Sequence, residues 1–260
     1  MSSSTIQIQK LGPDVISEEM LVQAATLFSS AYGIWGSLAQ EKMSKFCKPG
    51  HRVKMSAERL RQQSLAPGTR SVLVRAVSGD KLAGYAFATR WDYQGRQVCW
   101  ITQLCIDPEL RSQKLATKIL LALRDGEKDR GFGILSSHPH AILAALRAFG
   151  RGIEEIDMDI VKLHARGILD ASPVDYVKSC KLKGTLFGEK GDDGSVCSAD
   201  TGFWVDHDEP MAALEQVKAK GVKWAFGELL EGCEFIVVVK GAEVESAGDR
   251  VRRQENSSDL

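Results

Sequence analysis

A run of three β-type segments, followed by an abrupt change to a helical period, constrains the fold of this chain more than any other feature. Residues 71–77 are rich in β-branched side chains, and a turn at Gly79 joins them to the partner segment 81–90. A second turn at Gly95 leads into the third segment, residues 98–106. Because both turns are short, we expect the three segments to pair as an antiparallel meander.

After the meander, the apolar residues recur at helical spacing. This spacing predicts a helix over residues 112–130, and we expect Gly131 and Gly133 to end it. A short buried strand over residues 134–137 and a small helix over residues 139–149 are expected next. The change of period therefore predicts a strand–helix–strand–helix unit attached to the meander.

The remaining segments extend this pattern toward both ends. In chain order, we expect a strand near Ile6 and Ile8, helices over 18–32 and 57–65, a helix over 173–181 with Ser172 as its N-cap, a strand-like segment over 201–205, a helix over 210–220 and a strand over 234–240.

This mixture of elements predicts an α/β (α+β) fold around one mixed sheet. We expect a single domain over residues 1–245, made of a core (1–150), an insertion (151–193) and closing strands (194–245). Residues 246–260 are charged and lack a hydrophobic period, so we expect a disordered tail.

Composition excludes several classes of protein. The chain has 34 Lys and Arg against 34 Asp and Glu, a balance that indicates no nucleic-acid and no membrane partner. No apolar run has the length of a membrane span, and the polar N-terminus has no signal-peptide core. The six cysteines follow no zinc-site spacing. We therefore expect reduced thiols, no metal site and a cytoplasmic protein, with the nucleus as the alternative location.

The segment 98–117 joins a strand to a helix, and this junction is where we expect chemistry. The first turn of a helix presents unpartnered backbone N–H groups at a positive dipole end, so it can hold a diphosphate. Arg111 and Lys114 would add positive charge, and Ser112 and Thr117 would add hydroxyl donors. An ordinary strand–loop–helix unit has the same pattern, so both interpretations stay open at this point.

The junction resembles the acetyl-CoA motif of the GNAT superfamily of N-acetyltransferases, in which Arg/Gln-x-x-Gly-x-Gly/Ala follows a strand. Arg111, Lys114 and Ala116 stand at the three defined positions. The resemblance covers residues 6–150 in topology and is sharpest over 98–150. It implies the GNAT acyltransferase fold with a C-terminal insertion, in an elaborated member that we expect to be fungal.

Acetyl-CoA is the cofactor that this resemblance implies. The pantetheine arm of the cofactor enters between two diverging strands, with residues 135–137 as one wall. A backbone N–H near Leu104 then polarises the acetyl carbonyl. Lys114 replaces the central glycine of the family, and lysine can still serve there if its φ is negative. The implied cofactor-binding residues are Gln103, Leu104, Cys105, Ile106, Arg111, Ser112, Gln113, Lys114, Leu115, Ala116, Thr117 and His138.

The catalytic groups depart from the family pattern. His138 stands where an asparagine usually contacts the cofactor, and Ala145 replaces the tyrosine that commonly protonates the departing thiolate. Trp100 stands where some members carry a glutamate base. We expect His138 and Leu104 to be the catalytic residues, with capping of the next helix as the alternative role for His138. Other candidate bases are His140, Asp92 and Tyr93.

The run Asp-His-Asp-Glu at residues 206–209 looks like a metal cluster but precedes a predicted helix, so we expect it to favour the helix dipole. The expected function is acetyl transfer to the primary amine of a small molecule or amino acid. Two alternatives stay open, namely a protein acetyltransferase acting on lysines or N-termini, and a CoA-binding module without catalysis. The expected partner is a small-molecule amine, and assembly as a homodimer stays open.

Overall fold

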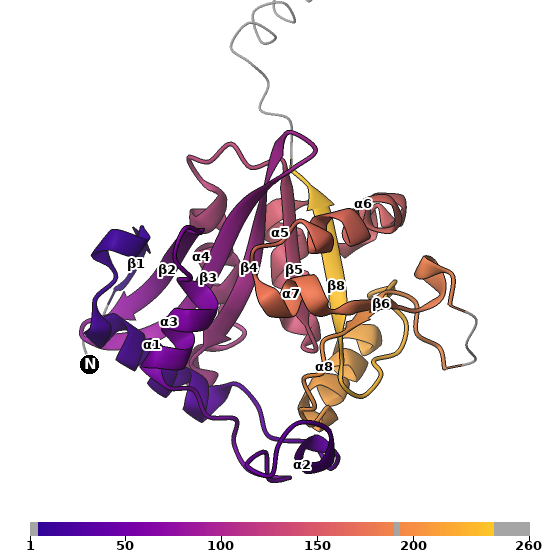
Figure 1. Cartoon of the computed structure of the whole chain (residues 1–260), viewed down its shortest axis with the longest axis horizontal. Helices are drawn as coiled ribbons and strands as arrows, with labels where there is room; N and C mark the ends of the chain where they lie inside the picture. The colour runs from indigo at the N-terminus through magenta and orange to yellow at the C-terminus, as the bar shows by residue number, and fades with distance from the viewer. Residues whose placement is uncertain (1–4, 190–192, 242–260) are drawn as a thin grey trace, which may run out of the picture.

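A mixed sheet of eight strands, in the order β1-β2-β3-β4-β5-β8-β7-β6, forms the centre of the molecule (Figure 1). The structure is a computed structural model, and it describes residues 5–189 and 193–241. The strands are β1 (Ile6–Leu11), β2 (Arg70–Ser78), β3 (Lys81–Tyr93), β4 (Arg96–Ile106), β5 (Gly131–Ser136), β6 (Lys181–Lys183), β7 (Ser198–Asp200) and β8 (Cys233–Lys240).

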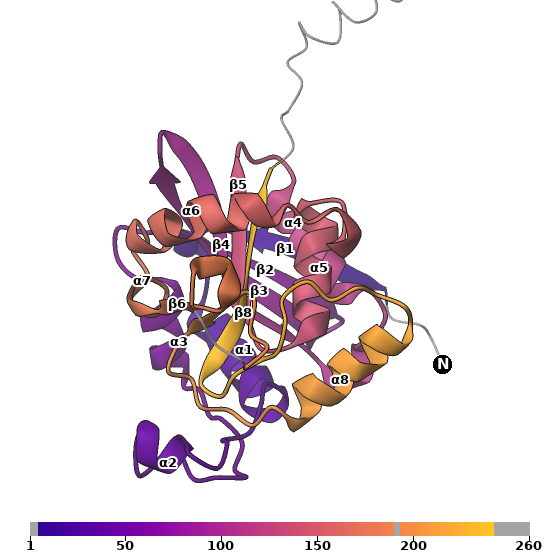
Figure 2. The same ribbon diagram turned by 90° about the vertical axis from the view of Figure 1, so that its right-hand side faces the viewer.

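Helices cover both faces of this sheet. Figure 2 shows α1 and α3 on one face and α4 and α5 on the other. The α-helices are α1 (Glu18–Ala31), α2 (Ala39–Lys42), α3 (Ala57–Ser64), α4 (Leu115–Arg124), α5 (Pro139–Phe149), α6 (Met158–Asp170), α7 (Asp175–Ser179) and α8 (Asp208–Ala219). No helix among the described residues is both long and apolar enough to cross a membrane.

The core is split by the sheet into two main apolar layers. On one face, Tyr85 and Phe87 of β3 pack with Leu21 of α1 and Leu60 of α3. On the other face, alternate residues of β2 and β3 pack against the apolar stripe of α4, and the same layer continues under α5. Strand β3 is therefore buried on both sides, which fixes its place in the middle of the meander.

The predicted meander and the helices beside it are confirmed. Strands β2, β3 and β4 pair antiparallel in sequence order, and β1 adds to the free side of β2. The helix predicted over residues 18–32 is α1, which Ser17 caps by accepting a hydrogen bond from the N–H of Met20. Local periodicity and short turns are therefore sufficient to predict this part of the fold.

The helix predicted over residues 112–130 is wrong at both ends. It begins at Leu115 and ends at Arg124. Gly131 and Gly133 do not end it, because both lie inside β5. A Cβ on Gly133 would collide with the ring of Trp100, so this glycine serves close packing between β5 and β4 rather than helix termination.

Two predictions in the C-terminal third also need correction. The strand expected over residues 201–205 lies earlier, at β7, and only Val205 of that segment makes a β-bridge. The helix expected over 173–181 contracts to α7, and the hydroxyl of Ser172 accepts a hydrogen bond from the N–H of Val174, just before α7 begins. The tail predicted over residues 246–260 lies outside the described residues.

Strands β4 and β5 are the only parallel neighbours in the described sheet, and they stay paired for only part of their length. Pairing runs from Val98 to Ile101 of β4 and stops there. At this point the register of β4 against β3 shifts, so that Thr102 is an extra, bulged residue. Beyond the bulge β4 continues to Ile106 along β3 alone, while β5 pairs with β8 as far as Ser136. A gap therefore opens in the sheet between β4 and β5.

Candidate functional site

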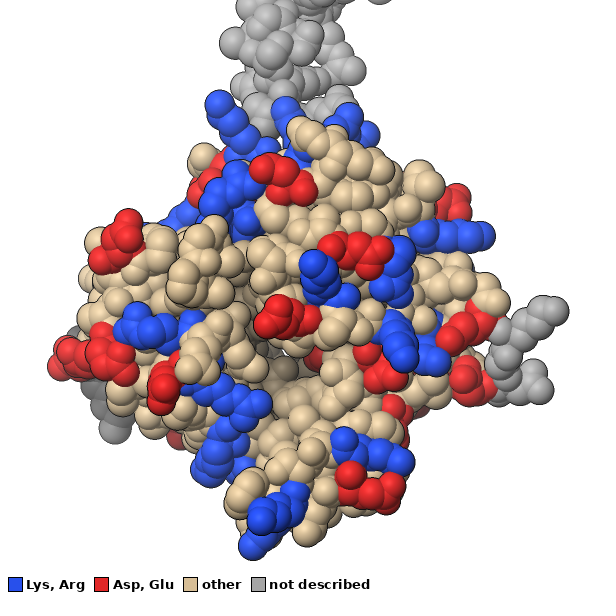
Figure 3. All heavy atoms as spheres, viewed as in Figure 1, with Lys and Arg blue, Asp and Glu red and all other residues tan. Residues whose placement is uncertain are grey.

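A cavity of about 620 Å³ lies where the two strands separate. Leu104, Cys105 and Ile106 of β4 line one wall, and residues 136–138 line the other. The divergence of strands implied by the resemblance is therefore present. Figure 3 shows the surface hollowed near the centre of this face of the molecule.

The loop that opens α4 forms the next part of the cavity wall. Lys114 is the N-cap residue, no side chain caps the helix, and the cavity is also lined by Leu115, Ala116 and Thr117. The φ angles of Ser112 and Lys114 are 63° and 61°. The condition of a negative φ at Lys114 is thus not met: the lysine adopts the left-handed conformation that glycine favours, at a cost of roughly 1–2 kcal/mol. The loop keeps the shape that a phosphate-binding turn needs.

Arg111 is already engaged by an acidic side chain from the far end of the chain. Its guanidinium donates to the carbonyl of Ala31 at 2.7 Å and to Glu209 Oε1 at 2.6 Å. Nε2 of His138 lies 3.8 Å from the same oxygen of Glu209. Hydrogen bonding from His138, together with the charge of Arg111, lowers the pKa of Glu209 to about 2. A carboxylate therefore lies beside the cation at the opening of α4.

His138 is held by contacts at both ring nitrogens. It is the N-cap of α5, where its Nδ1 accepts a hydrogen bond from the N–H of His140 at 3.2 Å, while Nε2 faces Glu209. Nδ1 as an acceptor implies that Nε2 carries the proton. This geometry agrees with the capping alternative. Burial is the largest cause that lowers the pKa of His140.

Other sequence candidates lie apart from the cavity. Gln103 points toward β3, where its Oε1 accepts from the Tyr85 hydroxyl at 2.5 Å, and the Gln113 amide lies 3.5 Å from the Glu109 carbonyl. Neither glutamine lines the cavity.

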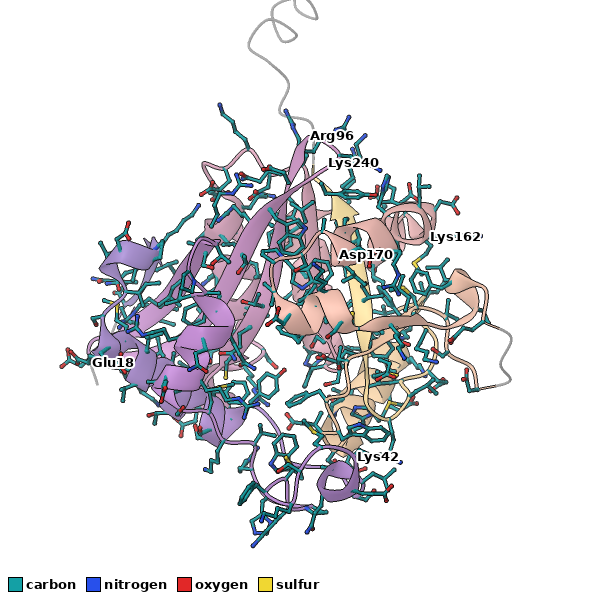
Figure 4. All side chains as sticks on the ribbon, viewed as in Figure 1. Glu18, Lys42, Arg96, Lys162, Asp170 and Lys240 are labelled. Carbon is teal, nitrogen blue, oxygen red and sulfur yellow. The ribbon has the colours of Figure 1, made fainter. Side chains whose placement is uncertain are left out.

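The hairpin candidates are more distant still. Tyr93 contacts His164 and Asp92 pairs with Arg70 at the β3–β4 hairpin. Figure 4 shows Arg96, on that hairpin, at the opposite end of the molecule from Lys42 of α2.

The acidic run at residues 206–209 behaves as a helix start. Asp206 accepts a hydrogen bond from the N–H of Asp208 at 2.8 Å, and Asp208 and Glu209 lie in the first turn of α8. Among the described residues, no group of three His, Cys, Asp or Glu side chains is arranged to hold a metal. The expected position of this run at the start of a helix is confirmed, but that expectation missed the contact of Glu209 with Arg111.

Sequence reasoning also missed a buried carboxyl group on β8. Glu234 is 6% exposed, and it makes no salt bridge in the part of the chain that the structure describes. Burial raises the pKa of Glu234 to about 7, and hydrogen bonding from Thr201 opposes this shift only in part. The signal in the sequence was a charged residue at the start of the apolar run Phe235–Val239, which is unusual for a buried strand.

Two tyrosines accompany this carboxyl group. The Tyr176 hydroxyl, on α7, donates to the carbonyl of the bulged Thr102 at 3.0 Å. Tyr32, the C-cap residue of α1, lines the cavity. Burial, followed by the charge of Glu234, raises the pKa of both hydroxyls above the ordinary tyrosine value.

The cavity is closed on a further side by contact between two distant loops. Trp35 and Val205 form a β-bridge. The N–H of Gly36 donates to the Trp204 carbonyl at 3.0 Å, and the N–H of Asp206 donates to the Ile34 carbonyl at 2.9 Å. The segment after α1 and the segment after β7 thus join into one continuous wall.

Solved structures of acetyltransferases resemble this chain at a distance. An aminoglycoside acetyltransferase from an uncultured soil metagenomic sample, crystallised with sisomicin, is 16% identical, with a TM-score of 0.39 over 58% of this chain and 92% of its own. An aminoglycoside 6'-N-acetyltransferase complexed with coenzyme A is 14% identical, with a TM-score of 0.33 over 50% and 61%. The paia N-acetyltransferase from Thermoplasma acidophilum, with coenzyme A, is 18% identical, with a TM-score of 0.32 over 50% and 79%. These similarities are too low to support an argument about the substrate.

A comparison with family models gives the assignment. No curated protein matches the chain. The model of the Acetyltransferase (GNAT) family matches residues 35–150, which include the meander, the gap between β4 and β5, and the loop that opens α4. Residues 35–150 therefore form a domain of the GNAT acetyltransferase family, whose acyl donor is acetyl-CoA.

Proposed function

We propose that the protein is an acetyl-CoA-dependent N-acetyltransferase that acetylates the primary amine of a small molecule or amino acid. The observation that carries this proposal is the cavity between β4 and β5, which continues into the uncapped N-terminus of α4. A strand gap supplies free backbone edges for an amide-bearing arm, and a helix N-terminus supplies N–H donors for a diphosphate. The two features meet in one cavity.

The residues present fit acetyl-CoA. The edge of β4 beyond Ile101 faces no partner on the β5 side among the described residues, so its backbone groups are available for the pantetheine amides. In this arrangement the N–H of Leu104 polarises the thioester carbonyl, and the opening turn of α4 holds the diphosphate. His138 supports this end of the site as a binding residue through Nε2.

Binding of the diphosphate requires Arg111 to change partner. The carboxylate of Glu209 occupies the guanidinium in the structure, and two anions cannot share it without repulsion. The Glu209 side chain is 52% exposed, so it can turn toward solvent when the cofactor arrives. The cofactor therefore competes with an internal anion for the same cation.

The reaction requires little chemistry from the protein. An uncharged amine attacks the polarised thioester carbonyl directly, and positioning supplies most of the rate. Ala145 is buried and has no proton to give, so the sulfur leaves without a tyrosine acid at that position.

The wall on one side of the cavity favours a small acceptor. The wall formed by the Trp35–Val205 bridge closes the side along which an extended polypeptide would have to lie. The left-handed φ of Lys114, which preserves the glycine-like loop, argues against a module that has lost cofactor chemistry.

Calorimetric titration with acetyl-CoA and desulfo-CoA, followed by a thiol-release assay over a panel of small amines and lysine peptides, tests the proposal. Arg111→Ala is expected to weaken acetyl-CoA binding about tenfold or more, because a charge-assisted contact to phosphate is lost. Unchanged affinity would contradict this placement of the diphosphate. Preferred turnover of lysine peptides would instead support the protein acetyltransferase alternative, and light scattering tests the homodimer.

A further inference from the structure

We propose that Glu234 is the general base of the reaction, accepting a proton from the ammonium form of the acceptor directly or through one water molecule. This inference rests on the proposed function and adds to it the residue that makes the acceptor nucleophilic. No position of the family motif leads to Glu234, since β8 lies outside residues 35–150.

The register of the sheet places Glu234 at the level of the reacting carbonyl. Ile101 of β4 is paired with Ile134 of β5, so three residues further along Leu104 is level with Ser137. Ser136 is paired with Phe235 of β8, so Glu234 is also level with Ser137. The bulge at Thr102 shifts this match by no more than one residue.

No strand separates Leu104 from Glu234 at this level. Strand β5 ends at Ser136, one residue before the level they share, and the chain then turns into α5. Two strand spacings of about 4.8 Å put the backbones at least about 10 Å apart. That separation leaves room for an amine nitrogen between the carboxyl group on one side and the acetyl carbon on the other.

Glu234 does not itself line the cavity, but its surroundings connect it to the cavity. Its charge acts on Tyr32, which lines the cavity, and on Tyr176, whose hydroxyl holds the Thr102 carbonyl at the start of the gap. The other titratable groups that it faces are Cys180, beside α7, and Cys233, on its own strand. Burial raises the pKa of all four neighbours, so they stay protonated at neutral pH. Glu234 is the member of this group that changes charge near neutrality.

A buried carboxylate without a cation is costly, and a substrate ammonium would supply the missing charge. In the reaction, one N–H proton of the ammonium passes to Glu234, and the nitrogen lone pair forms a bond to the acetyl carbon. The C–S bond breaks, and its electron pair leaves with the sulfur. The second N–H proton then passes to the thiolate, and Glu234 returns its proton to solvent. A base whose pKa lies near the working pH suits both halves of this cycle.

The test compares Glu234→Gln with Glu231→Gln, a matched change at an exposed glutamate on the turn before β8. Transfer to the best alkylamine of the panel and transfer to hydroxylamine are both followed by thiol release between pH 5.5 and 9. Hydroxylamine is largely unprotonated at neutral pH and needs no base to lose an ammonium proton. We expect Glu234→Gln to reduce kcat/KM for the alkylamine about 100-fold or more, and to leave hydroxylamine transfer nearly unchanged.

The pH profile supplies the second readout. In the wild type and in Glu231→Gln, kcat/KM for the alkylamine rises with pH and levels off above about 7. In Glu234→Gln it keeps rising up to pH 9 with the fraction of unprotonated amine and has no break near 7. Retention of both the rate and the break in Glu234→Gln would overturn the inference alone. An equal loss of kcat/KM with both nucleophiles would also overturn it, because such a loss would mean that Glu234 maintains the structure of the site and does not accept a proton. Absence of turnover with every nucleophile in the wild type would overturn the proposed function, and the base with it.

Discussion

Burial of Glu234 has a consequence for stability that can be measured without any substrate. The pKa of this carboxyl group rises from 4.5 to about 7 on folding, a difference of about 2.5 pH units. Between these values the folded chain holds a proton that the unfolded chain has lost, so stability falls as pH rises through this window. At about 1.4 kcal/mol per unit, the total is on the order of 3 kcal/mol. A glutamine, which never ionises, removes this penalty.

We therefore expect Glu234→Gln to be more stable than wild type at pH 8 by up to about 3 kcal/mol, and by much less at pH 4.5. Urea unfolding followed by tryptophan fluorescence, at half-unit steps of pH, gives the free energy of unfolding for both proteins. The lowered pKa values of His140 and His207 also make stability depend on pH, but they cancel in the difference between variants. A difference that stays constant from pH 4.5 to 8 would refute the assignment of a buried, uncompensated carboxyl group.

The strained loop and the internal anion give two further predictions. Replacing Lys114 with glycine should stabilise the protein by about 0.5–1 kcal/mol, because relief of the left-handed strain exceeds the added freedom of the unfolded chain. Thermal and urea unfolding measure this change, and a loss of stability would mean that the Lys114 side chain holds the loop. Glu209→Gln should tighten acetyl-CoA binding roughly threefold to tenfold, since Arg111 no longer has an anionic competitor. Calorimetry measures the affinity, and unchanged binding would show that Glu209 does not compete.

The parts of this molecule that depend on neighbours in sequence could be predicted from the sequence. The meander follows from short turns between β-type segments, and the presence of α4 follows from a strand that stops before a helical stripe, although the helix begins only at Leu115. The end of α4 could not be placed, because residues 125–130 carry no apolar side chain that would mark a continuing or an ended helix. In the structure Asp125 already leaves the helix in an extended conformation. The role of Gly133 in β5 could not be predicted either, because it depends on the Trp100 ring, with which a Cβ at this position would collide.

The candidate site divides in the same way. Arg111 and the turn at Lys114 could be found because the motif is contiguous. Glu209 lies 98 residues from Arg111 in the chain, and Glu234 reaches the gap only through the pairing of β8 with β5. No local sequence pattern predicts that Glu209 contacts Arg111 or that Glu234 lies near the gap. The left-handed φ of Lys114 is a similar case, since residue type alone disfavours it.

The pairing of β5 with β8 also determines how late during translation this part of the sheet can be completed. Ser136 and Cys233 are separated by 96 intervening residues, and at about 5–20 residues per second a ribosome needs roughly 5–19 s to translate them. During that interval the residues of the family domain have emerged with one sheet edge bare, a template on which other chains can pair. The nascent protein is thus most vulnerable to aggregation after residues 35–150 have been translated. This exposed edge of β5 is covered once β8 has been translated and pairs with it.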